Sequence, residues 1–472
     1  MRQPCVAVID VGKTHAKLTL WNTAGELVAR RERANQLVQG REYRALDVTG
    51  IENWLADTLS AVGAMSDIRT IVPVGHGAAA AIISDGQLAC LPVDYEQSIP
   101  ESTQIRYRGL RDEFEVTGSP PLPGGLNLGA QLYWLQELYA DRFEHDAHIL
   151  TWAQYWAWTL CGEMATEVTS LGCHTDLWVP TANKPSALAL GQHWAARLAS
   201  VRRADEVLGT LSKEWVAKTG LSSETTVLCG IHDSNAALLA ARGFDEISGR
   251  DATVISTGTW FLAMRTRASA DASLTRMAQG RDCLLNVDIS GNPVPTARFM
   301  GGREIERLST GNTLGLQDGS QPTEQTAAVR EVIRTDCRVL PTLASGVGPY
   351  PHACFRWDHE PGNAAERHAA IGLYVALVAD TSLDLIGARS QILIEGRFAQ
   401  YETFVRALAS LREDCEIYVS SAQNGVAFGA LRLVNPYLKP SSTLRRVEPF
   451  PIALDAYKSA WRMEAERLER FQ

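Results

Sequence analysis

The stretch VAVIDVGKTHAKLTLWN, residues 6–22, decides the fold that we predict for this 472-residue chain. An apolar run ends on Asp10, and Gly12, Lys13 and Thr14 follow it closely. The residues after them alternate between apolar and polar side chains, which is the period of a strand and not of a helix. The stretch therefore predicts two strands joined by a tight glycine turn, with a carboxylate at the mouth of the hairpin.

The glycine turn of this hairpin offers groups that bind phosphate. It is not a Walker A loop, which needs an earlier glycine and a following helix. Backbone N–H groups near Gly12 can form an anion nest, and Lys13, Thr14 and Lys17 can add contacts to phosphate oxygens. Asp10 would repel phosphate unless a metal lies between them, so we expect Asp10 to be a partner of Mg²⁺. An ordinary hairpin with polar turn residues is the alternative.

Residues 251–264, DATVISTGTWFLAM, repeat this arrangement. When Gly258 is placed on Gly12, apolar strands again flank a turn that carries hydroxyls, here from Thr257 and Thr259. Two such units indicate a duplicated architecture, because internal repeats set the fold. We expect a second phosphate-facing loop and a cleft between the two copies.

Strand and helix patterns alternate along the chain, which predicts the α/β class. We expect a strand, turn and helix over 225–243 that closes with Gly243 as its C-cap. A polar, glycine-containing stretch near 243–250 predicts domains at 1–245 and 246–472, and the packing of a C-terminal helix over 453–471 on either domain is left open. The other expected elements are strands within 69–84, 87–97 and 391–397, and helices at 129–160, 193–218, 364–387 and 425–433.

Composition excludes several classes of protein. The net charge is −9, which argues against nucleic acid or an anionic membrane as partner. The nine cysteines show no paired spacing, so neither a disulfide framework nor a zinc site is indicated. Asp10 interrupts the early apolar stretch, and no segment reaches the roughly 18 apolar residues of a membrane span. We expect a cytoplasmic protein with a small-molecule partner; whether it forms a homodimer is left open.

Asp233, in GIHDSNAA, is the candidate general base. It lies at the start of a predicted helix, where the dipole keeps a carboxylate ionised and where α/β proteins bind ligands. The neighbouring His232 can hydrogen-bond a polyol, so we predict that it contacts the substrate. A simple N-cap role for Asp233 is the alternative.

Other polar residues are predicted to bind the substrate. His76 and Gly77 follow a strand in a glycine-flanked turn, and a solvated loop histidine is the alternative. Asp94 and Tyr95 can hydrogen-bond sugar hydroxyls, although a surface acidic loop would have the same sequence. Gln154 stands in an aromatic-rich helix and is the residue there that packing explains least.

Two further glycine sites are candidates for nucleotide binding. Glu395, Gly396 and Arg397 end a predicted strand and could host a base over the glycine backbone. Gly301 and Gly302 open a predicted helix, whose N-terminus can receive phosphate. A tight connection with one glycine is the alternative for the first site, and paired glycines alone are a weak signal.

Taken together, six motifs resemble the FGGY carbohydrate kinases over roughly residues 5–435. The resemblance implies two domains of the actin-like, ribonuclease-H-like ATPase type, with ATP, Mg²⁺ and sugar in the cleft between them. The His-Asp pair at 232 and 233 is most similar to that of L-rhamnulose and L-fuculose kinases. The motifs, in chain order, are DVGKTHAK, GIHDSNAA, ISTGTW, FMGGREIE, LIEGRFAQ and NGVAFGALRL.

The resemblance also implies roles for individual residues. Asp233 would be the catalytic base, Asp10 would lie near Mg²⁺ and the phosphates, and Gly77 would approach the sugar. The nucleotide would contact Thr14 and Lys17 in the first loop, Thr257, Gly258 and Thr259 in the second, Gly396 under the adenine, and Asn424.

Three positions depart from the family pattern. Lys13 stands where a threonine or small residue is usual, Ala79 replaces an acid, and Glu395 replaces a second glycine of the adenine site. The expected activity is ATP-dependent phosphorylation of a hydroxyl of a ketose or deoxyketose. The alternative is a non-catalytic member that binds sugar and nucleotide as a sensor or regulator.

Overall fold

The computed structural model describes residues 2–143, 146–267, 277–309, 321–422 and 424–470. The chain divides into two compact units. Two short segments of the C-terminal half belong with the N-terminal residues, so the units do not follow one boundary in the sequence. Unit 1 comprises Met1–Gly243, Leu285–Pro293 and Asn424–Lys439, and unit 2 comprises Phe244–Leu284, Val294–Gln423 and Pro440–Gln472.

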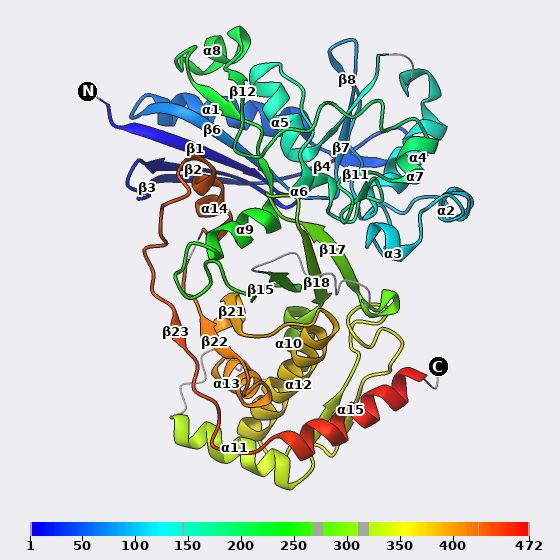
Figure 1. Ribbon diagram of the computed structural model, residues 1–472, viewed down its shortest axis with the longest axis vertical. Coiled ribbons are helices and arrows are strands. Elements are labelled where there is room, and N and C mark those ends of the chain that lie inside the picture. The colour runs from blue at the N-terminus through cyan, green and yellow to red at the C-terminus, as the bar shows by residue number, and fades with distance from the viewer. Residues whose placement is uncertain (1, 144–145, 268–276, 310–320, 423, 471–472) are drawn as a thin grey trace. The chain divides into compact units, whose positions relative to one another are not determined.

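A seven-stranded sheet forms the centre of unit 1 (Figure 1). Its strands follow the order β12-β13-β6-β1-β2-β3, and β14 also pairs with β6. Strands β1 and β2 are antiparallel with Asp10 opposite Lys17, so the predicted hairpin over 6–22 is confirmed. The strands are β1 (Pro4–Val11), β2 (His15–Asn22), β3 (Leu27–Ala34), β6 (Asp67–Gly75), β12 (Val207–Thr210), β13 (Thr226–Leu228) and β14 (Ile231–His232).

Parallel strands of this sheet end at the same edge. Strand β1 is parallel to β6, with Asp10 beside Val74. Strand β14 is also parallel to β6, with Ile231 beside Val74 and His232 beside Gly75. The residues that follow β1 and β14 therefore emerge close together at the carboxyl edge, where α/β proteins place their ligands.

A second part of unit 1 is built on the three-stranded sheet β8-β7-β9. The strands are β7 (Ala80–Ser84), β8 (Gln87–Cys90) and β9 (His148–Thr151), with the short pairs β4 (Leu37–Gln39) and β5 (Arg44–Leu46), and β10 (Trp178–Val179) and β11 (Lys184–Pro185). The helices of unit 1 are α1 (Val48–Gly63), α2 (Glu101–Arg108), α3 (Phe114–Thr117), α4 (Leu128–Leu138), α5 (Trp152–Cys161), α6 (Val168–Leu171), α7 (Ala187–Gly191), α8 (Lys213–Thr219), α9 (Asp233–Ala241) and α14 (Gly425–Val434), with the 3₁₀ turn η1 (Ala140–Phe143).

The sheet of unit 2 repeats the layout of the first. Its order is β17-β18-β16-β15-β21-β22-β23, in which β15 and β16 form an antiparallel hairpin and β21 runs parallel to β15. The predicted echo of the first hairpin is therefore confirmed. The strands are β15 (Ala252–Thr257), β16 (Phe261–Thr266), β17 (Cys283–Val287), β18 (Pro293–Phe299), β21 (Gln391–Gly396), β22 (Glu416–Val419) and β23 (Arg445–Arg446), with the pair β19 (Arg338–Leu340) and β20 (Arg356–Asp358).

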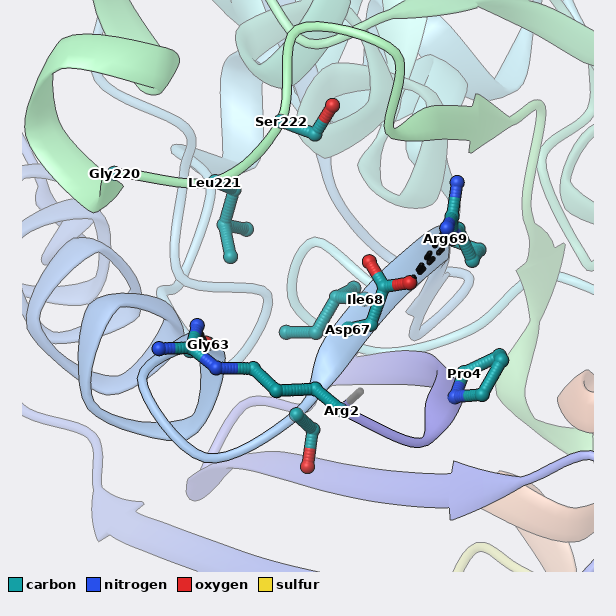
Figure 2. A pocket seen from close by; sticks show the side chains of 10 residues that line it. Arg2, Pro4, Gly63, Asp67, Ile68, Arg69, Gly220, Leu221 and Ser222 are labelled. Carbon is teal, nitrogen blue, oxygen red and sulfur yellow. Dashed lines mark hydrogen bonds and ion pairs between the residues drawn. The ribbon is translucent and has the colours of Figure 1, made fainter.

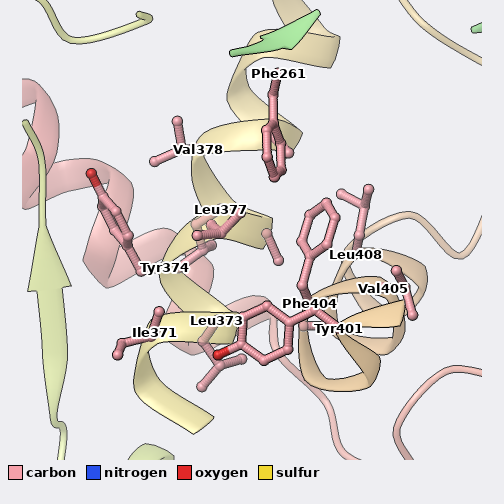
Figure 3. Packing of buried hydrophobic residues seen from close by; sticks show 14 of the residues in the cluster. Phe261, Ile371, Leu373, Tyr374, Leu377, Val378, Tyr401, Phe404, Val405 and Leu408 are labelled. Atoms are coloured by element: carbon pink, nitrogen blue, oxygen red, sulfur yellow. The ribbon is translucent and has the colours of Figure 1, made fainter. Parts of the chain in front are cut away.

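Helix α12 is the central helix of unit 2. Figure 3 shows Tyr374 and Leu377 of α12 packed among Phe261 of β16 and Phe404 of α13, all four buried. The helices are α10 (Gly301–Leu308), α11 (Pro322–Arg334), α12 (Ala364–Leu385), α13 (Glu402–Leu411) and α15 (Asp455–Arg470), with 3₁₀ turns η2 (Gln279–Arg281) and η3 (Arg397–Gln400).

Helix α12 corrects one prediction from the sequence. By length and composition it is apolar enough to cross a membrane, so the statement that no segment reaches that threshold was wrong. Its apolar window is 89% buried within the protein. That burial is what a core helix of a folded domain requires, because every face of it contacts other elements.

Several other predicted elements differ from those observed. Residues 129–160 do not form one helix, because β9 pairs with β7 between α4 and α5. Within 193–218 the helix starts only at Lys213, where the hydroxyl of Ser212 caps Trp215 N, and β12 precedes it. Helix α9 ends with Arg242 as C-cap in a right-handed conformation, so Gly243 is not the predicted left-handed cap. Helix α15 belongs to unit 2, where its Trp461 is buried.

Candidate active site

Asp10 and Asp233 form a carboxylate pair at the carboxyl edge of the unit 1 sheet. Asp10 lies near the end of β1, and Asp233 is the first residue of α9. Burial, together with the charge of Asp233, raises the pKa of Asp10 to about 7, while Lys17 opposes the shift. The Lys17 ammonium lies 3.9 Å from Asp10 Oδ2. The N-cap of α9 is His232, so Asp233 does not hold the N-cap position of that helix.

The carboxylate pair fits a divalent cation. Burial and the charge of Asp233 both raise the proton affinity of Asp10, and a cation beside Asp10 would stabilise its ionised form. Within the described residues, no three His, Cys, Asp or Glu side chains gather closely enough to hold a metal on their own. Asp10 would therefore be the residue that holds Mg²⁺, and the ion would supply positive charge to the phosphate oxygens.

His76 presents two unsatisfied ring nitrogens beside this pair. Neither nitrogen has a hydrogen-bond partner among the described residues, although both are buried. Burial lowers the pKa of His76 to about 4, even though the charge of Asp233 opposes this, so the ring is neutral. It packs edge-on against Tyr95 at a centroid distance of 5.5 Å and lies 6.0 Å from the Trp152 ring. The alternative of a solvated loop histidine is wrong, and the ring is available to bind hydroxyl groups.

Tyr95 lies in the same electrostatic environment. Its pKa is raised to about 12, first by burial and then by the charges of Glu96, Asp233 and Asp94. The phenol therefore stays protonated and can both donate and accept a hydrogen bond. The structure thus brings together Asp10, Asp233, His76 and Tyr95 from four separate parts of the chain.

Gly77 leaves no room for a side chain at this site. A Cβ atom at Gly77 would lie 2.4 Å from Cys173 Sγ and 3.1 Å from His232 Nε2.

We expect Gly77→Ala to displace His232 and lower kcat/KM by about 10²-fold, because misplacing a catalytic group by about 1 Å has that effect. Gly191→Ala is the matched control, since no atom of the described residues outside its own surroundings lies within 4 Å of its Cβ position. Equal steady-state kinetics for the two variants would contradict the expectation.

Lys13 differs from its predicted role at the phosphates. Its ammonium lies 2.7 Å from Asp94 Oδ1 and 2.7 Å from Glu96 Oε2, and 4.3 Å from the Tyr95 ring centroid. The other oxygen of Asp94 lies 2.6 Å from Arg44 Nε. Lys13 therefore ties the glycine turn to the loop that carries Tyr95.

Asp94 and Gln154 do not face a substrate. The Asp94 side chain is fully buried and meets cations at both oxygens. Gln154 is also fully buried, donates to Cys229 O and Gly230 O at 3.0 and 3.3 Å, and accepts from the hydroxyl of Thr151. Both predictions of sugar contact are corrected. These side chains instead hold the loop of Tyr95 and the turn that precedes β14.

Backbone groups of the glycine turn already form hydrogen bonds within the protein. Gly12 N donates to His15 O at 3.0 Å, and Gly12 O accepts from Asn35 Nδ2 at 2.8 Å. The predicted anion nest therefore does not include the Gly12 amide. Thr14 is exposed and Lys17 is partly exposed, so both side chains can reach a ligand.

Two glycines press against the β15–β16 turn of unit 2. A Cβ atom at Gly302 would lie 2.0 Å from Gly258 O, and one at Gly396 would lie 2.3 Å from Thr257 O. The Thr257 hydroxyl donates to Glu395 O at 2.6 Å and accepts from Phe398 N at 3.0 Å. Thr257 therefore connects β15 to β21, and its hydroxyl already forms two hydrogen bonds within the protein.

The remaining predicted nucleotide residues lie in different surroundings. Thr259 is exposed, and Gly301 begins α10 as predicted. The Arg397 guanidinium is exposed and pairs with Glu306. Asn424 belongs to unit 1, where it stands at the N-cap position of α14 in a left-handed conformation and its side chain makes no capping hydrogen bond.

Glu395, one of the departures, is a partly buried acid. Its Oε1 accepts from the Ser256 hydroxyl at 2.8 Å, and burial raises its pKa. It lies directly before Gly396, which has φ of +90°, a conformation that favours glycine.

The residues that surround His232 were not predicted from the sequence. Asn235 lies three positions after His232 on α9, and that helical spacing was the available signal. Thr169 and Cys173 contact His232 from a segment about 60 residues earlier, and no local pattern connects the two.

A pocket of about 570 Å³ lies away from these residues, at the start of β1 and β6 (Figure 2). Its arginines are engaged: Arg2 donates to Gly63 O at 2.7 Å, and Arg69 donates to Asp67 at 2.7 Å. No predicted site residue lines it. The lining residues are Arg2, Pro4, Gly63, Ser66, Asp67, Ile68, Arg69, Gly220, Leu221 and Ser222.

Comparisons with known proteins match both halves of the chain to the same family. Residues 98–240 match the N-terminal domain of the FGGY family of carbohydrate kinases, and residues 249–442 match the FGGY C-terminal domain. A carbohydrate kinase from Novosphingobium aromaticivorans is 49% identical over 99% of both chains, with a TM-score of 0.95. Xylulose kinase from Rhodospirillum rubrum is 16% identical over 99% of both chains, with a TM-score of 0.79. L-fuculokinase from Haemophilus influenzae is 23% identical over 64% of this chain and 66% of its own length.

Proposed function

This chain belongs to the FGGY family of carbohydrate kinases, and on that premise we propose that it transfers the γ-phosphoryl group of ATP to a hydroxyl of a neutral ketose or deoxyketose. The single observation that carries the proposal is the pairing of Asp10 with Asp233 at the carboxyl edge of the unit 1 sheet. One acid near the phosphates and one free to take a proton are what phosphoryl transfer to an alcohol needs.

Family membership and fold were both expected from the sequence, and both are confirmed. The family matches cover parts of both halves of the chain, and the fold is the two-domain, actin-like and ribonuclease-H-like ATPase fold of its structural neighbours. The α/β class follows from the two sheets and their flanking helices.

In the proposed reaction Asp233 acts as the general base. The sugar hydroxyl attacks the γ-phosphorus in line, and a new P–O bond forms as the bond to the β-phosphate oxygen breaks. The hydroxyl proton passes to the Asp233 carboxylate, and the electron pair of the broken bond leaves with ADP. Asp233 is 31% exposed, so a substrate can reach it.

We propose that Asp10 holds Mg²⁺, directly or through water. The ion would neutralise charge on the phosphate oxygens when it is bound. Thr14 and Lys17 lie beside Asp10 on the same hairpin and have side chains that can contact the same phosphates.

For unit 2 we propose nucleotide binding at the β15–β16 turn. Gly302 and Gly396 approach the backbone of Gly258 and Thr257 closely, so the turn is rigid and its outer face is formed by backbone groups and Thr259. Rigid backbone amides are suited to phosphate, because they need no rearrangement on binding. The start of α10 at Gly301 would add helix N-terminal amides.

The charges around Asp233 favour a neutral sugar over a sugar acid. Lys13 already pairs with two carboxylates, Lys17 faces Asp10, and His76 is uncharged. A substrate carboxylate would thus meet Asp233 without a free cation among the described groups of this cluster. Hydroxyl groups, in contrast, would satisfy both nitrogens of His76. L-fuculokinase and xylulose kinase among the similar proteins support a ketose.

A substrate panel tests this function. ADP release is measured with L-fuculose, L-rhamnulose, xylulose, glycerol and gluconate, each at saturating ATP and Mg²⁺. We expect at least one neutral ketose to stimulate ADP release well above the basal rate, and gluconate to give no stimulation. Tight ATP binding without stimulation by any sugar would favour the non-catalytic sensor, and stimulation by gluconate alone would refute the neutral-sugar proposal.

A further inference from the structure

We propose that His232 and Asn235 are positioning residues, which orient the Asp233 carboxylate through a histidine held as the tautomer protonated at Nε2. The inference rests on the proposed role of Asp233 as base. It replaces the prediction that His232 binds the sugar, because the His232 side chain is buried and its polar atoms contact protein groups.

The hydrogen-bond geometry around His232 selects one tautomer. Nε2 lies 3.1 Å from Asp233 Oδ1, and Nδ1 lies 3.2 Å from Asn235 Nδ2. The Asn235 amide nitrogen can only donate, so Nδ1 accepts from it and the ring proton lies on Nε2. Nδ1 is then a bare acceptor, and the Asn235 amide donates to it. Burial also lowers the pKa of His232, which keeps the ring neutral.

This arrangement makes the two oxygens of Asp233 unequal. Oδ1 accepts from Ser234 N at 2.5 Å and from the Ser234 hydroxyl at 3.1 Å, and it lies 3.1 Å from His232 Nε2. Oδ2 has no hydrogen-bond partner in the part of the chain that the structure describes. Two donors from Ser234 and the His232 ring all lie at one oxygen and fix the plane of the carboxylate, so Oδ2 is the oxygen that receives the sugar proton.

The backbone and the ring of His232 are held from a separate segment. His232 N donates to the Thr169 hydroxyl at 3.1 Å, and that hydroxyl donates to Glu167 Oε2 at 2.5 Å. Glu167 is fully buried, and Cys173 Sγ lies 3.3 Å from His232 Nε2. Contacts to the backbone and to both ring nitrogens leave the imidazole little freedom to rotate. A histidine that only filled space would not need these contacts.

Kinetics of Asn235→Leu test the positioning role. Leucine has nearly the shape of asparagine and removes only the donor to Nδ1. We expect kcat to fall by about tenfold, the effect of one hydrogen bond in a buried network, while the KM for sugar and the affinity for ATP stay within about twofold. In a His232→Phe background the same change should have no further effect on kcat, because the two residues then share one pathway. Additive losses, or unchanged kcat in Asn235→Leu, would overturn the proposal.

The tautomer can be measured without any substrate. In full-length protein labelled with ¹⁵N-histidine, the signals lost in His232→Phe identify His232. We expect a protonated Nε2 and an unprotonated Nδ1 at neutral pH, and a mixture of tautomers in Asn235→Leu. A protonated Nδ1 in the unmodified protein would refute the inference. If no sugar is phosphorylated, the proposed function fails and this spectrum still decides the tautomer.

Discussion

Asp233→Asn is expected to lower kcat by about 10²- to 10⁴-fold, the usual effect of losing a general base. Asparagine keeps the size of the side chain and can still contact Ser234 and His232 in part, so α9 should remain folded. The amide cannot accept the proton of the attacking hydroxyl, and only that step is lost. The prediction therefore separates catalysis from stability.

The measurement is steady-state ADP release with the best sugar of the panel, together with ATP binding by calorimetry and thermal unfolding. ATP affinity should be unchanged, because Asp233 is not among the residues proposed to contact the nucleotide, which are Thr14 and Lys17 in unit 1 and the β15–β16 turn in unit 2. Asp205→Asn is the control: this acid lies on the surface of unit 1 and pairs with Arg203. Near-normal turnover of Asp233→Asn would remove Asp233 from the role of base.

Asp380→Ala is expected to destabilise unit 2 by about 3–5 kcal/mol, the range for breaking a buried ion pair by removing one partner. Asp380 is fully buried in α12 and meets three cations. Arg412 Nε lies 2.8 Å from Oδ1, while Lys458 Nζ and Arg462 Nη2 lie 2.9 and 2.5 Å from Oδ2. Removal of the carboxylate would leave buried positive charge between α12, the end of α13 and α15.

Asp384→Ala is the matched control for this network. Asp384 contacts Arg412 and Arg462 at 2.5 and 2.6 Å, yet its side chain is 47% exposed. Its loss should therefore have an effect of about 1 kcal/mol or less, because an exposed carboxylate contributes little and Asp380 still pairs with both arginines. Hydrogen exchange of the α15 amides measures both effects as opening free energies. Equal protection factors in the two variants would contradict the proposed importance of burial.

The repeated hairpins could be predicted because their patterns are local. Alternating side chains around Gly12 and Gly258 indicate two strands and a turn without any knowledge of distant residues. The same holds for Asp233 at a helix start, since a strand, a glycine and a run of small apolar residues stand next to each other in the chain. For these features the covalent neighbours supply most of the information.

The prediction of one helix over residues 129–160 was wrong because the structure of this segment depends on a strand that is distant in the sequence. Residues 148–151 are apolar enough for either structure, and pairing with β7 decides in favour of a strand. Backbone hydrogen bonds to a distant strand outweigh a weak local preference. Helix 193–218 failed similarly, since β12 is stabilised by its pairing with β13.

The sequence by itself determined the α/β class and the two repeated hairpins, and it predicted Asp10 and Asp233 as the acids of the site. Only the tertiary structure decided that Lys13 pairs with Asp94 and Glu96, that Gln154 is buried in the fold and that His232 faces Asp233 instead of solvent. The physical reason is that backbone conformation follows from neighbouring residues, whereas the partner of a charged or polar side chain is whatever group distant segments bring within hydrogen-bonding distance.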